Sequence, residues 1–310
     1  MIKSTHPEFE SLVRGETVPA NPALLGFLED TGVPHIVSDY QVALAGNLEL
    51  LDENRILAEI KRAPNVRTDL IPPMEIHRVI GSTNDLVMMR LDHQASLLCT
   101  AEMQTAGRGR RGRNWVSPFG RNVYLTYGRR MRRPLSELGG LSLVVGMQVV
   151  EVLRDAGIAA GLKWPNDVLL NGGKLGGILV ELKTAVSAGV GVVAGVGLNL
   201  HLDASDASQI DQAFSVAESS KSLSRNHLIG AIAGRMITAF DQFDHDGFAP
   251  FWPDWPRYNL YAGQEIRVLR GGGEFRHGRD AGIDSEGNLI IDTHNGLEVY
   301  NSGEVSMRPV

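Results

Sequence analysis

The sequence predicts an α+β fold, and three observations support this class. Through the middle of the chain, apolar runs that suit strands are separated by glycine-rich turns. Only two long helical patterns interrupt these runs, which favours an antiparallel or mixed sheet over a doubly wound one. Short β segments at close intervals fill the C-terminal end of the chain. With 310 residues, the protein is long enough for two or three domains.

The elements of the first 245 residues follow from apolar spacing and turn residues. The long central helix is predicted from apolar residues at helical spacing, and Gly157 suits its end. Asn171, Gly172 and Gly173 suit a tight hairpin turn between two strands. In chain order, the expected elements are helical segments at 23–28 and 52–60, strands at 76–80, 97–103 and 123–127, the long helix at 135–156, strands at 162–164, 168–170, 175–182 and 190–200, and a helix at 225–245.

The C-terminal segments predict a small barrel. Turn signals GGG, DSEGN and HNG separate β segments expected at 264–270, 274–283, 289–292 and 297–299. A stretch rich in Trp and Pro, at 247–256, is the expected joint with the central region. The predicted domains are therefore an N-terminal region at 1–60, a central domain at 70–255 and a C-terminal domain at 260–310.

Composition excludes several classes of protein. The net charge of -6 gives no global attraction to DNA or to an anionic membrane. The single cysteine, Cys99, excludes an internal disulfide, fits a reducing compartment, and is expected to pack inside an apolar run rather than act as a nucleophile. The N-terminus lacks the pattern of a signal peptide and no apolar run is long enough to span a membrane, so we expect a cytoplasmic protein.

The segment GRGRRGRNW, from Gly107 to Trp115, is the strongest candidate for a binding site. Glycine lets backbone N–H groups approach a ligand, and guanidinium groups match carboxylate or phosphate oxygens in pairs. The segment lies between two predicted strands, so it is interpreted as an anion-binding loop. On spacing alone, a solvated basic loop or a nucleic-acid patch explains it equally well.

Four further clusters surround this loop in the sequence. GSTN at 81–84 either caps a helix that begins near Asn84 or binds a neutral polar ligand group. KWPND at 163–167 either forms a surface turn or projects Lys163 and Asp167 from a rigid support. Lys174 in GGKLGG needs an anionic partner or an exposed strand edge. GVGLNL at 195–200 contains a strand, broken by glycine, that ends in Asn199, and a β-bulge would also explain its glycines.

No nucleophile or zinc site emerges from the sequence. The nine histidines lack metal-ligand spacing, and neither a CxxC nor an HExxH nor a Walker sequence occurs. The remaining chemistry is that of Lys, Arg and backbone donors, which position anions and stabilise charge that develops on an acyl or phosphoryl group.

The ordered motifs GSTN, QTAGRGRRGRNW, KWPND, KLGGILVE and GVGLN resemble those of the bacterial biotin protein ligases. The resemblance is strong over residues 75 to 200 and weaker towards the C-terminus. It implies a catalytic domain like that of class II aminoacyl-tRNA synthetases and a C-terminal SH3-like barrel. It also implies a two-step reaction: biotin and MgATP give biotinyl-5′-adenylate, and the acyl group passes to a lysine of the biotin carboxyl carrier protein.

The resemblance also assigns residues. Lys163 and Arg108 would place cations between the biotin carboxylate and the α-phosphate, and Asp167 is a candidate for assisting the incoming lysine or Mg²⁺; no protein metal ligand is assigned. Arg111 and Arg113 either bind triphosphate or stay solvated, Phe214 is a candidate cover for the adenine, and Arg308 either approaches the nucleotide or is a surface charge. The expected ligand contacts are Ser82, Thr83, Asn84 and Gln104 for biotin, Gly107, Arg108, Gly109, Arg110 and Trp115 in the loop, Lys163 for the reacting carboxyl or the adenylate, and Lys174, Asn199 and Arg308 towards the nucleotide. Gly176 and Gly197 are further expected cofactor-binding positions.

The N-terminal region departs from the relatives that begin with a winged helix-turn-helix and act as repressors. The stretch at 36–51 resembles the end of such a module, but few residues precede it and Pro19, Pro22 and Pro34 break the available helices. Three basic residues face ten acidic ones through residue 60, which argues against a DNA partner. We expect a short, degenerate winged-helix-like region; the alternatives are a bifunctional repressor, a lipoate-type ligase, or a binder without turnover. A homodimer is also an open alternative.

Overall fold

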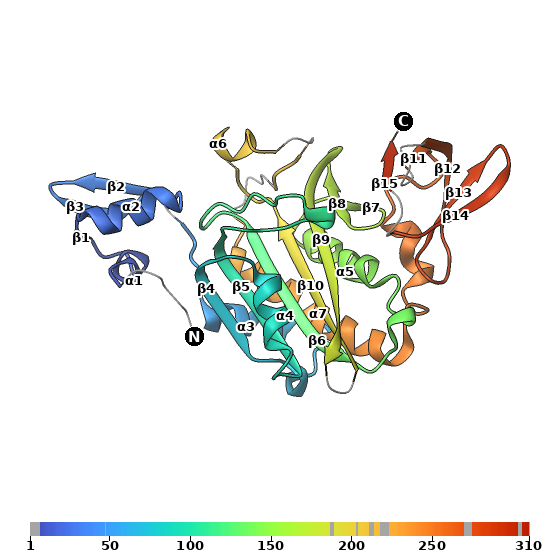
Figure 1. Ribbon diagram of the computed structural model, residues 1–310, viewed down its shortest axis with the longest axis horizontal. Helices are drawn as coiled ribbons and strands as arrows, with labels where there is room; N and C mark the ends of the chain where they lie inside the picture. The colour runs from blue at the N-terminus through green and yellow to red at the C-terminus, as the bar shows by residue number, and fades with distance from the viewer. Residues whose placement is uncertain are drawn as a thin grey trace.

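The computed structural model describes residues 7–46, 48–186, 189–202, 204–210, 214–217, 223–269, 275–302 and 306–309. Figure 1 shows a central sheet with helices, a small N-terminal unit on one side and a small β unit on the other. No helix among the described residues is long and apolar enough to cross a membrane.

The central sheet has seven strands and mixed topology, which confirms the α+β class. Only β4 and β5 pair in parallel; the other neighbours are antiparallel. In spatial order the strands are β4 (Met74–Ile80), β5 (Ser96–Gln104), β6 (Val123–Met131), β10 (Gly189–Leu198), β9 (Gly173–Val186), β8 (Asp167–Leu170) and β7 (Gly161–Lys163). The short β7 and β8 leave most of β9 paired on one side only.

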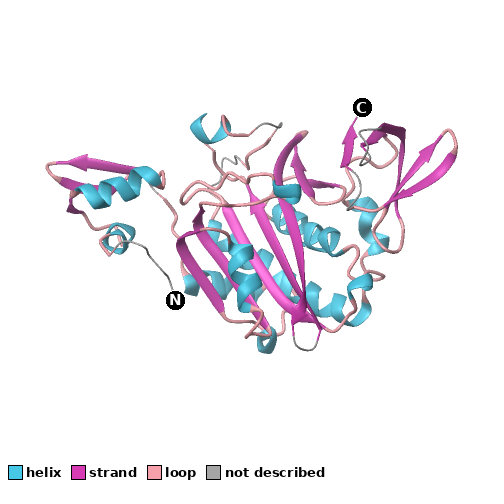
Figure 2. Cartoon of the chain, viewed as in Figure 1, coloured by secondary structure: helices cyan, strands magenta, loops and turns pink. Residues whose placement is uncertain are grey.

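Helices cover both faces of this sheet (Figure 2). The helices α3 (Glu53–Arg62), α5 (Leu141–Asp155) and α7 (Arg225–Asp246) pack together, with α5 and α7 against the strands, and they enclose the main hydrophobic core. Helix α4 (Thr83–Arg90) packs against β5, β6 and β10 above a second core that includes Cys99. The Cys99 side chain is fully buried, and burial raises the pKa of its thiol, so its predicted role in packing is confirmed.

The long helix expected at 135–156 is interrupted, so that prediction was wrong at its N-terminal end. A short 3₁₀ turn, Leu135–Glu137, precedes α5, which begins only at Leu141. Gly140 lies between them with φ +78, a left-handed conformation that ends the helical path. The apolar spacing continues through the break because Leu138 and Leu141 pack into the same core.

The N-terminal unit has a hydrophobic core of its own. Its elements are α1 (Phe9–Val13), β1 (Val18–Pro19), α2 (Pro22–Asp30), β2 (His35–Ser38) and β3 (Gln41–Leu44), with the three strands in one sheet. Phe119 of the central domain joins this core and contacts the Phe9 ring edge-on at 5.5 Å between centroids, and Met103 packs against the same core. Helix α3 instead belongs to the main core, since Ile56 and Ile60 are buried there against α7.

The C-terminal unit is an antiparallel sheet of five strands, in the order β14-β13-β12-β11-β15. The strands are β11 (Glu265–Leu269), β12 (Phe275–Ile283), β13 (Leu289–Thr293), β14 (Gly296–Tyr300) and β15 (Ser306–Pro309). The first four occupy the segments that the sequence predicted, and β15 was not predicted. Arg270, the GGG turn and Glu274 lie outside the described residues. A 3₁₀ turn, Trp252–Arg257, lies in the expected joint.

Candidate functional site

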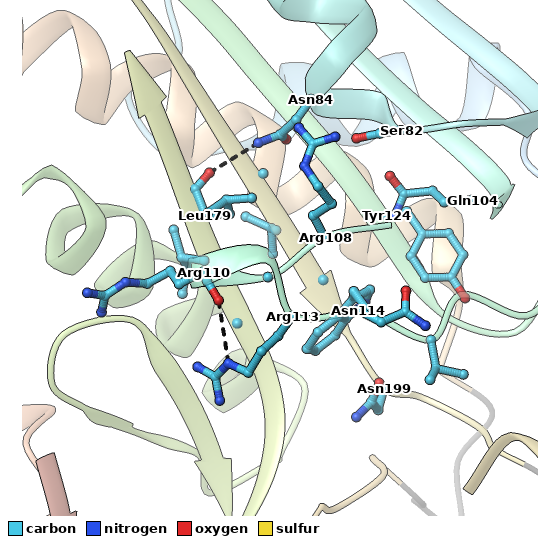
Figure 3. Close-up of a pocket in the computed structure, with 18 of the residues that line it drawn as sticks. Ser82, Asn84, Gln104, Arg108, Arg110, Arg113, Asn114, Tyr124, Leu179 and Asn199 are labelled. Atoms are coloured by element: carbon cyan, nitrogen blue, oxygen red, sulfur yellow. Dashed lines mark hydrogen bonds between the residues drawn. The ribbon is translucent and has the colours of Figure 1, made fainter. Parts of the chain in front are cut away.

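A cavity of about 430 Å³ lies between the arginine loop and strands β9 and β10. Figure 3 shows arginine, asparagine and glutamine side chains around it, contributed by α4, β5 and the loop. The predicted ligand contacts that line it are Ser82, Thr83, Asn84, Gln104, Arg108, Gly109, Arg110, Trp115, Lys174, Gly197 and Asn199, together with the two candidates Arg113 and Phe214. The predicted residues absent from the lining are Gly107, Lys163, Asp167, Gly176 and Arg308.

Neutral polar groups form one wall of the cavity. The backbone N–H and the hydroxyl of Thr83 donate to Oε1 of Gln104, at 2.9 and 3.0 Å. The hydroxyl of Thr126 lies 2.7 Å from Oδ1 of Asn84. Ser82 is the N-cap residue of α4, and it also lines the cavity. The capping and the ligand-facing interpretations of GSTN are therefore compatible in this structure.

The arginine loop is folded back on itself. Arg108 and Asn114 form a bridge, and the N–H of Gly109 donates to the carbonyl of Arg113 at 2.7 Å. Gly107 lies beneath the loop, where a Cβ would be 2.7 Å from the carbonyl oxygen of Trp115. The glycine at this position therefore allows close backbone packing and does not itself face the cavity.

The loop arginines have different partners. Arg108 donates to both carboxylate oxygens of Asp85, at 2.6 and 2.5 Å, and this contact lowers the pKa of Asp85. Arg110 donates to Oδ1 of Asn166 at 3.1 Å and to the carbonyl of Ser302, in the C-terminal unit. Arg113 is exposed but lines the cavity.

Arg111 differs from its neighbours in the loop. It is exposed and is not among the lining residues, and its φ of 58 is left-handed. Of the two arginines that the sequence left open, Arg113 thus lines the cavity and Arg111 does not.

A cluster of two lysines and one aspartate adjoins the cavity. Nζ of Lys174 lies 2.6 Å from one oxygen of Asp167, and Nζ of Lys163 lies 3.8 Å from the other. Lys163 and Asp167 face each other across the β7–β8 hairpin. Burial lowers the pKa of Lys163, the charge of Asp167 partly offsets this effect, and the positive charge of Arg308 lowers the pKa further. Asp167 thus has both lysines as partners: Lys163 faces it across the KWPND hairpin, and Lys174 reaches it from β9.

The Trp115 ring packs against strand β10. A Cβ at Gly197 would lie 2.5 Å from this ring, and Nζ of Lys174 lies 5.7 Å from the ring centroid. The glycine is needed for close approach rather than for a bulge, because the register between β10 and β9 is regular from Gly191 to Leu198. Gly176, on β9, also allows a close approach of the two strands, since a Cβ there would lie 2.6 Å from the carbonyl oxygen of Gly197.

Several residues at the site were missed from the sequence. Asn166 belongs to KWPND and Asp85 follows GSTN directly, so their motifs contained the signal. Thr126 and Glu181 are single polar residues on apolar strands, and they reach the site only through the pairing of β6, β10 and β9. Nothing in the linear sequence distinguishes such residues from a polar strand face.

The chain is similar to several known proteins. Residues 76–199 match the model of the Biotin/lipoate A/B protein ligase family, and residues 261–308 match the Biotin protein ligase C terminal domain. The chain is 35% identical over 233 residues to the Bifunctional ligase/repressor BirA of Escherichia coli, which covers 74% of this chain and 72% of that protein. It is 32% identical over 238 residues to the Biotin--[acetyl-CoA-carboxylase] ligase of Mycobacterium tuberculosis, with 73% and 85% covered.

The fold is also similar to that of a solved structure. The biotin protein ligase from Aquifex aeolicus in complex with biotin and ATP is 25% identical and has a TM-score of 0.64, covering 77% of this chain and 100% of that chain. Both the sequence matches and this structure include the region that contains the cavity. Because relatives more than 30% identical align over more than two thirds of their own length, the chain belongs to the biotin protein ligase family.

Proposed function

We propose that the protein is an ATP-dependent biotin–[acetyl-CoA-carboxylase] ligase, which activates biotin as biotinyl-5′-AMP and transfers it to a lysine of the biotin carboxyl carrier protein. The observation that supports this most strongly is the composition of one cavity, which combines neutral hydrogen-bonding groups with several cations. A neutral bicyclic urea suits the first set, and a carboxylate beside phosphates suits the second.

In this proposal, biotin lies beside Ser82, Thr83 and Asn84, and the nucleotide lies towards Asn199 and Phe214. The biotin carboxylate oxygen attacks the α-phosphorus, and pyrophosphate leaves with the electrons of the broken P–O bond. The two anions repel each other until cations lie between them. Arg108 and Lys174 line the cavity, and Lys163 adjoins it as the second lysine on Asp167, so we propose that all three supply this positive charge. Their charge also stabilises the negative charge that grows on the phosphoryl oxygens.

The second step needs a free amine from the carrier. The lysine nitrogen attacks the acyl carbon, AMP leaves as the anion, and the nitrogen loses a proton. We propose that Asp167 acts mainly by holding Lys163 and Lys174 in place, because its two oxygens already face these ammonium groups. This role differs from direct assistance to the incoming lysine, which the sequence left open.

Mg²⁺ would enter with ATP. The described lining includes no aspartate or glutamate, and no group of three or more His, Cys, Asp or Glu residues suited to a metal occurs in the described part of the chain. Mg²⁺ commonly keeps several water ligands and binds substrate phosphates. We therefore propose that phosphate oxygens and water, rather than a cage of side chains, supply most of its ligands.

We propose that ligation, and not DNA recognition, is the main function. Several relatives are named bifunctional ligase/repressors, and the N-terminal unit has helices and a β-hairpin. However, α2 contains no lysine or arginine and ends in Glu29 and Asp30, which is unfavourable beside phosphates. We place the boundary of this unit before Leu51, since α3 packs in the main core. A cytoplasmic location and the choice between monomer and homodimer stay predictions.

One assay tests the proposal and its rivals. The protein is incubated with biotin, MgATP and a biotin carboxyl carrier domain, and the carrier is examined by mass spectrometry. We expect one biotinyl group on one lysine, dependent on ATP. Modification with lipoate in place of biotin would indicate a lipoate-type ligase, and no modification of either kind would refute the proposal. A gel shift with the operator of a biotin operon tests the repressor alternative.

A further inference from the structure

Arg108 is held by two carboxylates that the ligand chemistry above does not use. Asp85 lies in the first turn of α4 and receives both Nη1 and Nη2 of Arg108, at 2.6 and 2.5 Å. Glu181, on β9, lies 3.5 Å from Nη2 through Oε1. The loop side chain is therefore attached to a helix on one side and to the central sheet on the other.

Glu181 has a second contact, with another residue that lines the cavity. Its Oε2 accepts a hydrogen bond of 2.8 Å from Nδ2 of Asn84. A carboxylate only accepts, so this contact turns the amide nitrogen of Asn84 towards Glu181 and its oxygen towards the hydroxyl of Thr126, 2.7 Å away. One carboxylate thus fixes the orientation of Asn84 and also contacts Arg108.

We propose that Asp85 and Glu181 are positioning residues, which hold Arg108 over the cavity before the ligand binds and keep it there while the adenylate exists. The inference rests on the proposed ligase function. It assigns no direct ligand contact to either carboxylate, since neither lines the cavity.

The geometry favours positioning over competition with the ligand. Asp85 accepts one hydrogen bond from each of Nη1 and Nη2 of the Arg108 guanidinium. The remaining N–H donors of this group are left for a ligand oxygen. The support is rigid, because the first residue of α4, Thr83, is bound through two hydrogen bonds to Gln104. A loop arginine fixed in advance loses less conformational entropy when the ligand arrives.

The first test compares Asp85→Asn with a matched control, Asp92→Asn. Asp92 pairs at 2.7 Å with Lys183, which lies two residues after Glu181 on the same strand. The Asp92 side chain is 44% exposed, close to the 51% of Asp85. In Asp85→Asn we expect the KM for biotin to rise about tenfold and the adenylate to escape more readily, seen as biotinylation of bystander lysines. Such a factor is ~1.4 kcal/mol, within the range for a typical hydrogen bond. The control should change neither readout.

A double-mutant cycle tests whether Asp85 acts through Arg108. In an Arg108→Gln background, Asp85→Asn should add no further change in KM or in adenylate escape. Asp85→Glu should restore part of the effect, and Glu181→Gln should weaken retention less than Asp85→Asn does, because the amide keeps an acceptor for Asn84.

The outcomes separate this inference from the proposed function. If the wild-type protein forms no adenylate, the proposed function has failed and these variants are not needed. If the wild type is active and Asp85→Asn equals the Asp92→Asn control, the positioning role is wrong. A lower KM in Asp85→Asn would also overturn it, since Asp85 would then be competing with the ligand.

Discussion

The indole N–H of Trp164 donates a hydrogen bond of 3.0 Å to the carbonyl oxygen of Gly287, which joins the KWPND hairpin to the C-terminal unit. Trp164 is buried and follows Lys163 directly in the chain. Arg110 makes a second link, from the arginine loop to the carbonyl of Ser302. The C-terminal unit therefore supports two cationic segments of the site, although none of its described residues lines the cavity.

Replacing Trp164 with Phe removes the donor for Gly287 and keeps an aromatic ring. Gly287 is buried, so its carbonyl is left without this partner, and we expect a loss of ~1 to 3 kcal/mol in the free energy of unfolding. Trp255→Phe is the matched control, because Trp255 is equally buried and its indole N–H has no hydrogen-bond partner among the described residues. Urea unfolding curves measure both. Equal losses in the two variants would show that ring volume, and not the hydrogen bond, is responsible.

The arginine loop should be protected by ligands. Asp85 holds the Arg108 side chain, but the glycine-rich remainder of the loop still loses conformational entropy when a ligand orders it, and an anion held by Arg108 and Arg110 would compensate for this loss. We expect slower trypsin cleavage between residues 107 and 115 when biotin and MgATP are both present. Cleavage after Arg62, whose side chain is 73% exposed on α3, is the internal reference. The same loop cleavage rate with and without ligands would refute this prediction.

Lys163 should set an alkaline limit to adenylate formation. Burial lowers its pKa, so the ammonium group loses its proton at a lower pH than an ordinary lysine does. The rate of adenylate formation should be highest below this lowered pKa and fall as the pH rises through it. The rate is measured as pyrophosphate release without carrier. Lys163→Arg keeps its charge, so its rate should be lower at neutral pH but lose the alkaline decline.

The contribution of Lys163 to the free energy of unfolding should change in the opposite direction and rise with pH. Below the lowered pKa, Lys163 is charged in both the folded and the unfolded chain, and the folded state carries the cost of burying that charge. This cost is relieved as the pH rises from the folded pKa towards the unfolded one. In the rate measurement, an alkaline decline of adenylate formation that persists in Lys163→Arg would assign the titration to another group.

The sequence predicted the central strands well, and the reason lies in local patterns. The apolar runs at 97–103 and 123–127 became β5 and β6 because each is long enough to cross the sheet and is bounded by turn residues. The break before Leu141 was missed, since Gly140 stops the helix without interrupting the apolar spacing. The site was predictable where motifs concentrate polar residues, and not where single residues meet across strands, as Glu181 does with Asn84.

Gly197→Ala tests the proposed position of the nucleotide. The new Cβ would lie 2.5 Å from the Trp115 ring, so the indole must move away from β10 and its contact with Lys174 changes. Because we place the nucleotide at this end of the cavity, the KM for ATP should rise at least tenfold, while the KM for biotin changes much less. Overpacking of this kind also costs ~1 to 3 kcal/mol of stability, so the melting temperature is measured in parallel. Gly26→Ala controls for glycine replacement, since no atom lies within 4 Å of a Cβ there. An equal rise in both KM values would mean that the Trp115 ring covers the whole ligand rather than its nucleotide half.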